Sequence, residues 1–346
     1  MQNANGALRE RKERHERLKG LAPGRRRRKA AWGALLRLWL GSGVLVLLLS
    51  CAAEPPPGRS GEYQLFARTN LAAWCIVPFD ALKRGPVERA AMLDRLGLRL
   101  FAYDYRAEHI PTFDAEIEAL EQRNVRLLAW WFPTVLNDEA RLILEVLRRH
   151  DIKAQLWVTG GGEAVSGAEA VRARVGDEAR RVRPIAEAAG RIGCTVALYN
   201  HGGWFGEPEN QIAIIERLRA QGVTNVGIVY NLHHGHEHLD RFPALLERMK
   251  PHLLALNLNG MVRGGDAVGK KILPLGQGDL DLSLLQTIRD SGWRGPVGIL
   301  NHTDEDAEER LADNLAGLEW LVKQLDGGVP GPRPVPFRES HGKKKG

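Results

Sequence analysis

The chain alternates short apolar runs with amphipathic stretches eight times between residues 70 and 325, and this alternation constrains its fold most strongly. The apolar runs are continuous, as in parallel strands that are buried on both faces. The predicted strands are residues 71–77, 99–103, 126–132, 153–158, 195–199, 226–230, 253–258 and 297–300. The predicted helices are residues 86–96, 113–123, 138–150, 168–192, 209–220, 242–250, 282–291 and 305–325. Eight βα units over about 255 residues predict an α/β fold of the (β/α)8 TIM barrel type.

An open, doubly wound sheet is the alternative architecture. It would usually carry a G-x-G-x-x-G turn between a strand and a helix, and no predicted strand is followed by one. The run Gly160-Gly161-Gly162 lacks the Lys-Ser/Thr of a phosphate-binding loop, so we interpret it as a flexible loop.

Several residues mark helix starts. Pro86, Pro208 and Pro243 stand where the first helical turn tolerates proline. Asn137 and Asp240 are predicted N-caps, because their side chains can accept hydrogen bonds from free amides of the first turn.

The first 50 residues carry 12 Lys and Arg against 3 Asp and Glu, whereas the remainder carries 37 basic against 39 acidic residues. The basic character therefore belongs to a leader. Without a basic excess on the folded domain, we predict no nucleic-acid partner.

The leader ends in an uncharged stretch, residues 38–50, followed by Cys51. Thirteen residues are too few to span a bilayer, which takes about 20, but they suit the apolar region of an export signal. The run Leu48-Leu49-Ser50-Cys51 resembles a bacterial lipobox, which implies lipidation of Cys51 and a membrane contact through the lipid. An ordinary signal peptide and a membrane anchor are the alternatives.

These features divide the chain into four parts. Residues 1–51 are predicted as leader and signal peptide, 52–62 as a linker, 63–326 as the barrel and 327–346 as a flexible tail. We expect an exported protein, either periplasmic or a cell-envelope lipoprotein. Cys75 and Cys194 fall on the first and fifth strands, which face each other across a barrel, so we predict two buried thiols and no disulfide.

Polar and aromatic residues gather where the predicted strands end, and TIM-barrel enzymes place their active sites at those ends. Seven of the 11 histidines lie there, namely His109, His201, His233, His234, His236, His238 and His302. The tryptophans at or beyond these ends are Trp74, Trp130, Trp131, Trp157 and Trp204. Aromatic rings can stack on a sugar while amides and imidazoles bond its hydroxyls, so we predict a small-molecule carbohydrate as ligand.

Around residues 198–204 and 230–234 the chain resembles the xylose isomerase-like TIM barrel superfamily, which includes sugar isomerases and epimerases. The resemblance covers about residues 65–325. It implies a divalent metal held by Glu on the fifth strand, Asp on the sixth, His on the seventh and Glu on the eighth. Asn200-His201, His234, Arg263 and the loop 273–279 match the pattern.

The four metal-ligand positions depart from that pattern. They hold Tyr199, Asn231, Asn257 and Leu300 or Asn301, and none of these supplies the negative charge that a hard cation needs. We therefore predict no metal and no other cofactor. A rebuilt metal site from His201, His234, His236 and His238 is the alternative.

Imidazoles titrate in the range useful for proton transfer, so the predicted catalytic residues are His234 and His201. The predicted substrate-binding residues are Tyr199, Asn231, His233, Asn257, Arg263, Trp204 and Asn301. Asp104 and Glu207 are the nearest carboxylates.

Two functions fit this pattern. The first is an exported sugar isomerase- or epimerase-like enzyme, or a lyase, that acts on a sugar or polyol through an altered, metal-free centre. The second is a non-catalytic carbohydrate-binding lipoprotein. The scarcity of strand-end arginines disfavours phosphorylated ligands.

Overall fold

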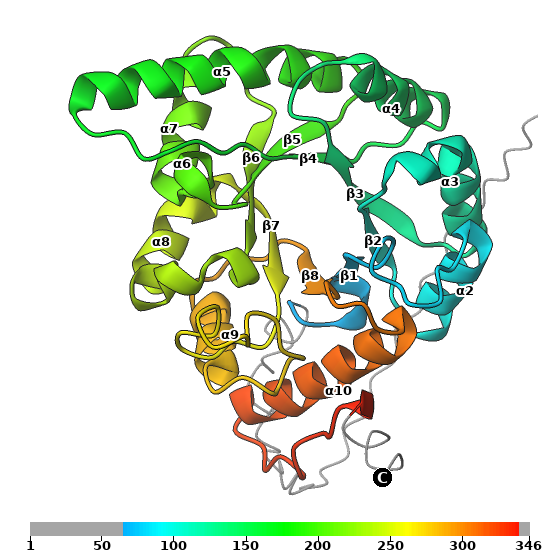
Figure 1. Cartoon of the computed structure of the whole chain (residues 1–346). Helices are drawn as coiled ribbons and strands as arrows, with labels where there is room; N and C mark the ends of the chain where they lie inside the picture. Colours follow the sequence, from blue (N-terminus) through cyan, green and yellow to red (C-terminus); the bar gives the residue numbers. More distant parts are fainter. Residues whose placement is uncertain (1–64, 339–346) are drawn as a thin grey trace, which may run out of the picture. The chain divides into compact units, whose positions relative to one another are not determined.

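A computed structural model describes residues 65–338, in which eight parallel strands close into a barrel in sequence order (Figure 1). The predicted leader, Cys51 and the linker to residue 62 lie outside the described residues. The strands are β1 (Leu71–Trp74), β2 (Leu100–Tyr103), β3 (Arg126–Phe132), β4 (Gln155–Val158), β5 (Thr195–Tyr199), β6 (Val226–Asn231), β7 (Leu253–Leu258) and β8 (Val297–Leu300). Pairing of β1 with β8, from Leu71 opposite Val297 to Trp74 opposite Leu300, closes the barrel and confirms the predicted TIM barrel.

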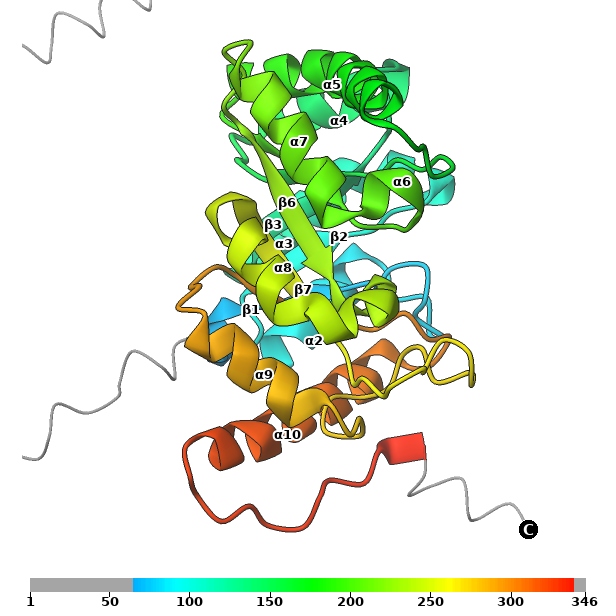
Figure 2. The same ribbon diagram turned by 90° about the vertical axis from the view of Figure 1, so that its left-hand side faces the viewer.

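Helices surround the strands and alternate with them (Figures 1 and 2). They are α2 (Pro86–Arg95), α3 (Phe113–Gln122), α4 (Asp138–Arg149), α5 (Ala168–Arg191), α6 (Gly203–Gly206), α7 (Pro208–Arg219), α8 (Phe242–Met249), α9 (Asp281–Asp290) and α10 (Ala307–Leu325). Short 3₁₀ turns join them at η1 (Arg68–Asn70), η2 (Ala107–Thr112), η3 (Leu232–His234), η4 (His236–Arg241) and η5 (Lys250–His252). Within residues 65–338, no helix is both long and apolar enough to cross a membrane.

The helix-start predictions are largely confirmed. Pro86, Pro208 and Pro243 lie in first turns, and the Asn137 side chain accepts a hydrogen bond of 2.9 Å from the amide of Ala140. The prediction for Asp240 is wrong. The chain runs through η4 into α8, so Arg241 stands at the cap and Asp240 lies inside the 3₁₀ turn.

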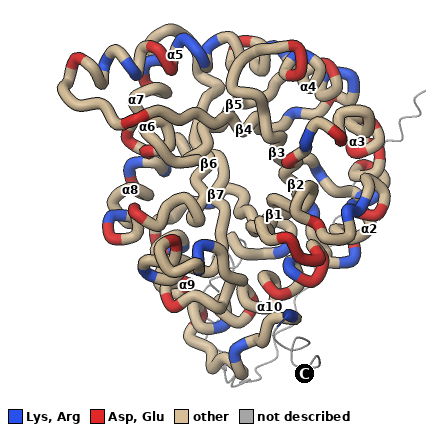
Figure 3. The backbone as a smooth tube through the Cα atoms, viewed as in Figure 1, with Lys and Arg blue, Asp and Glu red and all other residues tan. Residues whose placement is uncertain are grey.

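Two apolar layers build the barrel. One lies between strands and helices, and the other fills the barrel interior with side chains such as Ala72, Ala102, Trp157 and Val229. Cys75 and Cys194 are buried free thiols, as predicted. Charged residues are found mainly along the outer helices and loops (Figure 3).

The beginning of the predicted tail packs against the barrel. Trp320 on α10 donates to the carbonyl of Gly331 over 2.9 Å, and Gln277 donates to that of Pro334 over 2.7 Å. The amide of Phe337 donates to Asp313 over 3.0 Å. These bonds fix the segment after α10 along that helix, as Figure 2 shows.

Candidate active site

A small cavity of about 70 Å³ lies where the strands end at the centre of the barrel. Its position is the one at which TIM-barrel enzymes act. The lining residues come from the ends of six strands and the loops beyond them: Trp74, Cys75, Phe79, Asp104, Arg106, Trp131, Tyr199, His201, His233, His234 and His302.

Aromatic rings from opposite strands form the base of this central cavity. The Trp74 and Trp157 rings meet edge to face with centroids 4.6 Å apart, and the Trp74 and Trp131 rings are 5.9 Å apart. Tyr199 meets Trp131 edge to face at 5.1 Å. Trp74 and Tyr199 are buried, whereas Trp131 is half-buried and available to a ligand.

Four imidazoles continue the ring of aromatic side chains around the cavity. Centroid distances are 4.5 Å between His201 and His234, 3.6 Å between His233 and His234, and 6.0 Å between His233 and His302. Burial, and then the neighbouring imidazoles, lower the pKa of His234 to about 3 and hold the pKa of His233 well below its ordinary value. Partial burial also lowers the pKa of His201 and of His302. The cluster is therefore neutral at pH 7.

A hydrogen-bond network fixes one of these imidazoles. The Asn231 side-chain NH₂ and the Trp74 indole NH, the latter at 3.3 Å, both donate to the Tyr199 hydroxyl oxygen. The Asn231 side-chain oxygen lies 2.8 Å from Nδ1 of His233. Because an amide oxygen only accepts, the His233 proton sits on Nδ1, and Nε2 keeps its lone pair. Burial raises the pKa of Tyr199 well above its ordinary value, so its hydroxyl stays protonated.

Asp104 is the one carboxylate among the residues lining the central cavity. It is 2% exposed, Oδ1 accepts from the amide of Val77 at 3.3 Å, and Oδ2 has no hydrogen-bond partner within residues 65–338. Burial raises the pKa of Asp104 to about 7, against the opposing effect of Arg106. Arg106 does not pair with this carboxylate, because its guanidinium donates to the carbonyls of Asp104 and Tyr105 at 2.9 and 2.8 Å.

Cys75 adjoins Asp104 and has a backbone φ of 58°. That left-handed conformation is uncommon for a residue other than glycine, and it turns the chain sharply after β1 at the cavity wall. Burial, followed by the charge of Asp104, raises the pKa of the Cys75 thiol well above its ordinary value, so the thiol is a poor nucleophile.

The structure brings five of the predicted site residues together. His201, His233, His234 and Tyr199 line the central cavity, and Asn231 links two of them.

Two further predicted residues, Asn257 and Asn301, are buried nearby in the fold. Neither side-chain amide has a hydrogen-bond partner in the described part of the chain. Leu300 rather than Asn301 belongs to the interior apolar layer that contains Tyr199, so Leu300 occupies the inward position of β8.

Trp204 and Arg263 do not reach the central cavity. Gly202 and Gly203 have φ of 82° and 62°, and the turn they make places Trp204 beneath the loop at Gly162, whose carbonyl accepts its amide proton at 2.8 Å. Trp204 is 6% exposed, with the guanidinium of Arg174 over its ring.

Arg263 lies in the loop after β7, and its exposed side chain pairs with Asp240. Glu207, the other carboxylate noted from the sequence, pairs with His238 and Arg241 instead of facing the cavity.

The alternative metal site from four histidines is not assembled. His236 bonds to the carbonyl of Lys271 at 2.9 Å, and His238 lies between the Tyr230 hydroxyl and Glu207. Among residues 65–338, no three His, Cys, Asp or Glu side chains are grouped so that they could hold a metal ion.

Five residues that line the cavity have no predicted site role: Asp104, Arg106, His302, Phe79 and Cys75. Four of them follow a predicted strand within three residues, which was their signal, whereas Cys75 falls inside the first predicted strand. Asp104 was noted as a nearby carboxylate, but it follows β2 in a segment with no family motif, and its burial is what distinguishes it from Glu207.

The family model described as xylose isomerase-like TIM barrel matches residues 81–324. The chain belongs to that family. No curated protein matches it.

Several solved structures share the xylose isomerase-like fold. The 3-keto-D-glucoside 4-epimerase from E. coli has 14% identity and a TM-score of 0.53, over 74% of this chain and 99% of that one. The D-allulose 3-epimerase from Methylomonas sp., solved with D-allulose, has 14% identity and a TM-score of 0.51, over 76% and 98%. The IOLI protein, solved with a zinc atom, has 14% identity and a TM-score of 0.57, over 73% and 98%. At these identities the likeness concerns the fold.

The metal that the xylose isomerase-like resemblance implies does not fit the residues present. Its four positions hold Tyr199, Asn231, Asn257 and Leu300, which offer a protonated phenol, two amides and an alkyl chain. This donor set carries no negative charge to offset the dehydration of a divalent cation. The unpartnered amide of Asn257 suits a neutral hydroxyl or water better.

Proposed function

We propose that this protein is an exported enzyme of the isomerase or epimerase type that acts on a sugar or polyol through metal-free acid–base chemistry. The observation that carries the proposal is Asp104, a buried carboxylate with one unpartnered oxygen at the wall of the central cavity. The other lining residues are aromatic and imidazole rings, the Cys75 thiol and the Arg106 side chain.

The chemistry needs one group that takes a proton from carbon and one donor for the oxygen that becomes negative. Asp104 is suited to the first role because a pKa of about 7 leaves both protonation states populated near neutral pH. The Tyr199 hydroxyl uses its oxygen to accept from Trp74 and Asn231, so its proton remains available to the oxygen of a substrate carbonyl.

In the proposed step, the C–H bond beside the substrate carbonyl breaks and its proton passes to Asp104, while its electrons form the enolate. Return of a proton to the opposite face of the same carbon completes an epimerisation. Return to the former carbonyl carbon, with a proton moving from the adjacent hydroxyl to the former carbonyl oxygen, completes an isomerisation. His233 and His234, neutral at pH 7, supply lone pairs or N–H donors to the substrate hydroxyls. Trp131 supplies a half-exposed ring for the apolar face of the sugar.

The structural neighbours support the same reaction class. Two are named as a 3-keto-D-glucoside 4-epimerase and a D-allulose 3-epimerase, so this fold carries sugar epimerases elsewhere.

The test is to incubate the protein in deuterated buffer with a panel of aldoses, ketoses and keto-glycosides. NMR then measures the exchange of carbon-bound hydrogen for deuterium in each sugar. We expect deuterium to enter at least one sugar. Asp104→Asn should abolish the exchange and Asp279→Asn, at an exposed position, should leave it unchanged. Exchange that survives Asp104→Asn would contradict the proposed role of this carboxylate.

A non-catalytic carbohydrate-binding protein is the second candidate. It is favoured by the neutral phenol and amides that stand at the family's ligand positions. If calorimetry detects sugar binding and the bound sugar shows no deuterium exchange under any condition, the binding function is selected over the enzyme.

We also propose that the leader directs export and that Cys51 carries a lipid, on the basis of the sequence run ending at that residue. Cys51→Ala, expressed in a bacterial host, should release the protein from membranes. Continued membrane attachment of that variant would instead indicate a protein anchor.

A further inference from the structure

The central cavity is small for the ligand class proposed above. Its volume is about 70 Å³, whereas a dry engineered cavity of about 150 Å³ is the size that accepts benzene. A sugar ring is bulkier than benzene. Only one edge of such a ring can therefore enter the central cavity, and the remainder of the ligand must lie in adjoining space.

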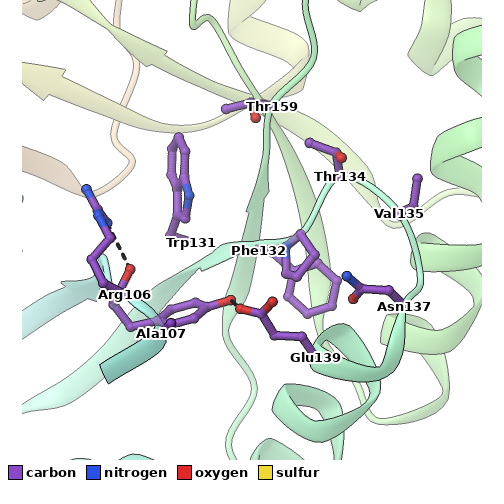
Figure 4. A pocket seen from close by; sticks show the side chains of 11 residues that line it. Arg106, Ala107, Trp131, Phe132, Thr134, Val135, Asn137, Glu139 and Thr159 are labelled. Carbon is purple, nitrogen blue, oxygen red and sulfur yellow. Dashed lines mark hydrogen bonds between the residues drawn. The ribbon is translucent and has the colours of Figure 1, made fainter. Parts of the chain in front are cut away.

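A second cavity of about 400 Å³ adjoins the first. The two share Trp131 and Arg106, so these side chains stand at the border between them. Figure 4 shows Trp131 and Arg106 on one side of this cavity, with Thr134, Val135 and Asn137 on the other. Its volume falls within the range of about 300–1,000 Å³ that is usual for small-molecule sites.

The lining of this second cavity suits an uncharged ring. Tyr105 and Phe132 give it buried aromatic surface, and Pro133 and Val135 extend the apolar wall. Asn137, Thr134 and Thr159 supply a few neutral polar groups.

Charge in the second cavity is limited to two side chains that already have partners. The carboxylate of Glu139 accepts a hydrogen bond from the Tyr105 hydroxyl, and the Arg106 guanidinium donates to backbone carbonyls. This arrangement disfavours a phosphate group and leaves apolar area for a second ring to cover.

We propose that the ligand is a glycoside whose second ring, a sugar or an aromatic aglycone, occupies the cavity bordered by Trp131 and Val135. The inference rests on the proposed function, because it assumes that the first ring of the ligand enters the central cavity.

The experiment is isothermal titration calorimetry with D-glucose, D-galactose, D-mannose and D-xylose, each paired with its p-nitrophenyl α- and β-glycosides. At least one glycoside should bind tenfold or more tightly than its parent sugar. Val135→Trp, at a loop position 48% exposed, should fill the second cavity, remove that tenfold gain and leave the parent sugar within twofold. Val329→Trp, at a position 95% exposed after α10, is the matched control and should keep the gain.

The outcomes separate the two proposals. Equal affinity for sugar and glycoside overturns the glycoside inference and leaves the proposed function standing. The same conclusion follows if the tenfold gain survives Val135→Trp in a protein whose circular dichroism and melting temperature are unchanged. Absence of binding by every sugar and glycoside overturns both. If Val135→Trp fails to fold, Thr159→Phe, at another residue that lines the second cavity, makes the same test.

Discussion

The indole NH of Trp74 donates to the hydroxyl of Tyr199 across the barrel, over 3.3 Å, although the two residues are 125 positions apart. Their strands, β1 and β5, stand on opposite sides of the closed sheet. Through Asn231 the same network reaches His233, so the base of the central cavity connects three strands and orients an imidazole.

Removing the hydroxyl of Tyr199 tests this network. Tyr199→Phe leaves the buried donors of Trp74 and Asn231 without their acceptor, and we expect a loss of about 1–3 kcal/mol in the free energy of unfolding. Urea denaturation measures it. Tyr230→Phe, which removes a hydroxyl bonded to His238 alone, should cost less. An equal or larger loss in the Tyr230 variant would argue against the network.

Asp104 predicts a pH dependence of stability. The pKa of this carboxyl is raised to about 7 from an ordinary value of 3.8, so the folded state binds the proton more tightly than the unfolded state. The stabilisation is complete below pH 4 and is lost as pH rises to about 7. A change of one pKa unit is worth about 1.4 kcal/mol. Between pH 4 and pH 8 the wild type should therefore lose a few kcal/mol in the free energy of unfolding that the Asp104→Asn variant keeps. A pH-independent difference in denaturant midpoints would contradict the raised pKa.

The imidazole cluster predicts a pH dependence of stability opposite in sign to that of Asp104. The pKa of His234 is lowered to about 3 from 6.5, so its contribution to stability is complete above pH 6.5 and is lost as pH falls toward 3. His234→Gln should therefore lose less stability than the wild type between pH 6.5 and pH 4. Urea unfolding measures the free energy of unfolding of both proteins as a function of pH, with pH 8 as the reference. If the two free energies change in parallel with pH, the lowered pKa of His234 is contradicted.

Two tryptophans should respond differently to truncation. Trp131→Ala removes a half-exposed ring at the cavity and should weaken sugar binding by about 1 kcal/mol while leaving the fold intact. Trp204→Ala removes a buried ring and should cost about 3–5 kcal/mol of folding stability. Calorimetric titration and thermal unfolding separate the effects. A stable Trp204→Ala protein that loses sugar binding would return Trp204 to the site.

The ligand positions predict an absence of metal-dependent stabilisation. An ion at 100 times its dissociation constant would add about 2.7 kcal/mol, which corresponds to about 5 °C or more in melting temperature. We expect no such shift in the wild type with Mn, Mg, Co or Zn ions, or with a chelator. The combination Tyr199→Glu, Asn231→Asp, Asn257→His and Leu300→Glu should create one, and should destabilise the metal-free protein because three carboxylates are crowded together. Stoichiometric metal in the purified wild-type protein would contradict the neutral centre.

Local patterns in the sequence suffice to predict the barrel and its strand order. The continuous apolar runs and amphipathic stretches are local patterns, and β3 and β5 begin and end where those patterns predict. The cap at Asn137 is equally local, because a side chain and an amide three residues away suffice to make it. Histidines and aromatic residues after the strands also indicated the end of the barrel at which the central cavity lies, since parallel strands bring their carboxyl ends together.

Which strand-end residues face the cavity depends instead on long-range packing. Trp131 and Trp204 both lie at or just beyond the end of a predicted strand, so the sequence does not distinguish them. A turn at Gly202 and Gly203 buries Trp204 away from the cavity, whereas Trp131 lines the cavity. The sequence places Asp104 and Glu207 equally near the site, yet only Asp104 lines the cavity, and its raised pKa arises from burial that no local pattern shows. Burial depends on what packs around a residue, and in a closed barrel most of those neighbours come from parts of the chain that no local pattern specifies.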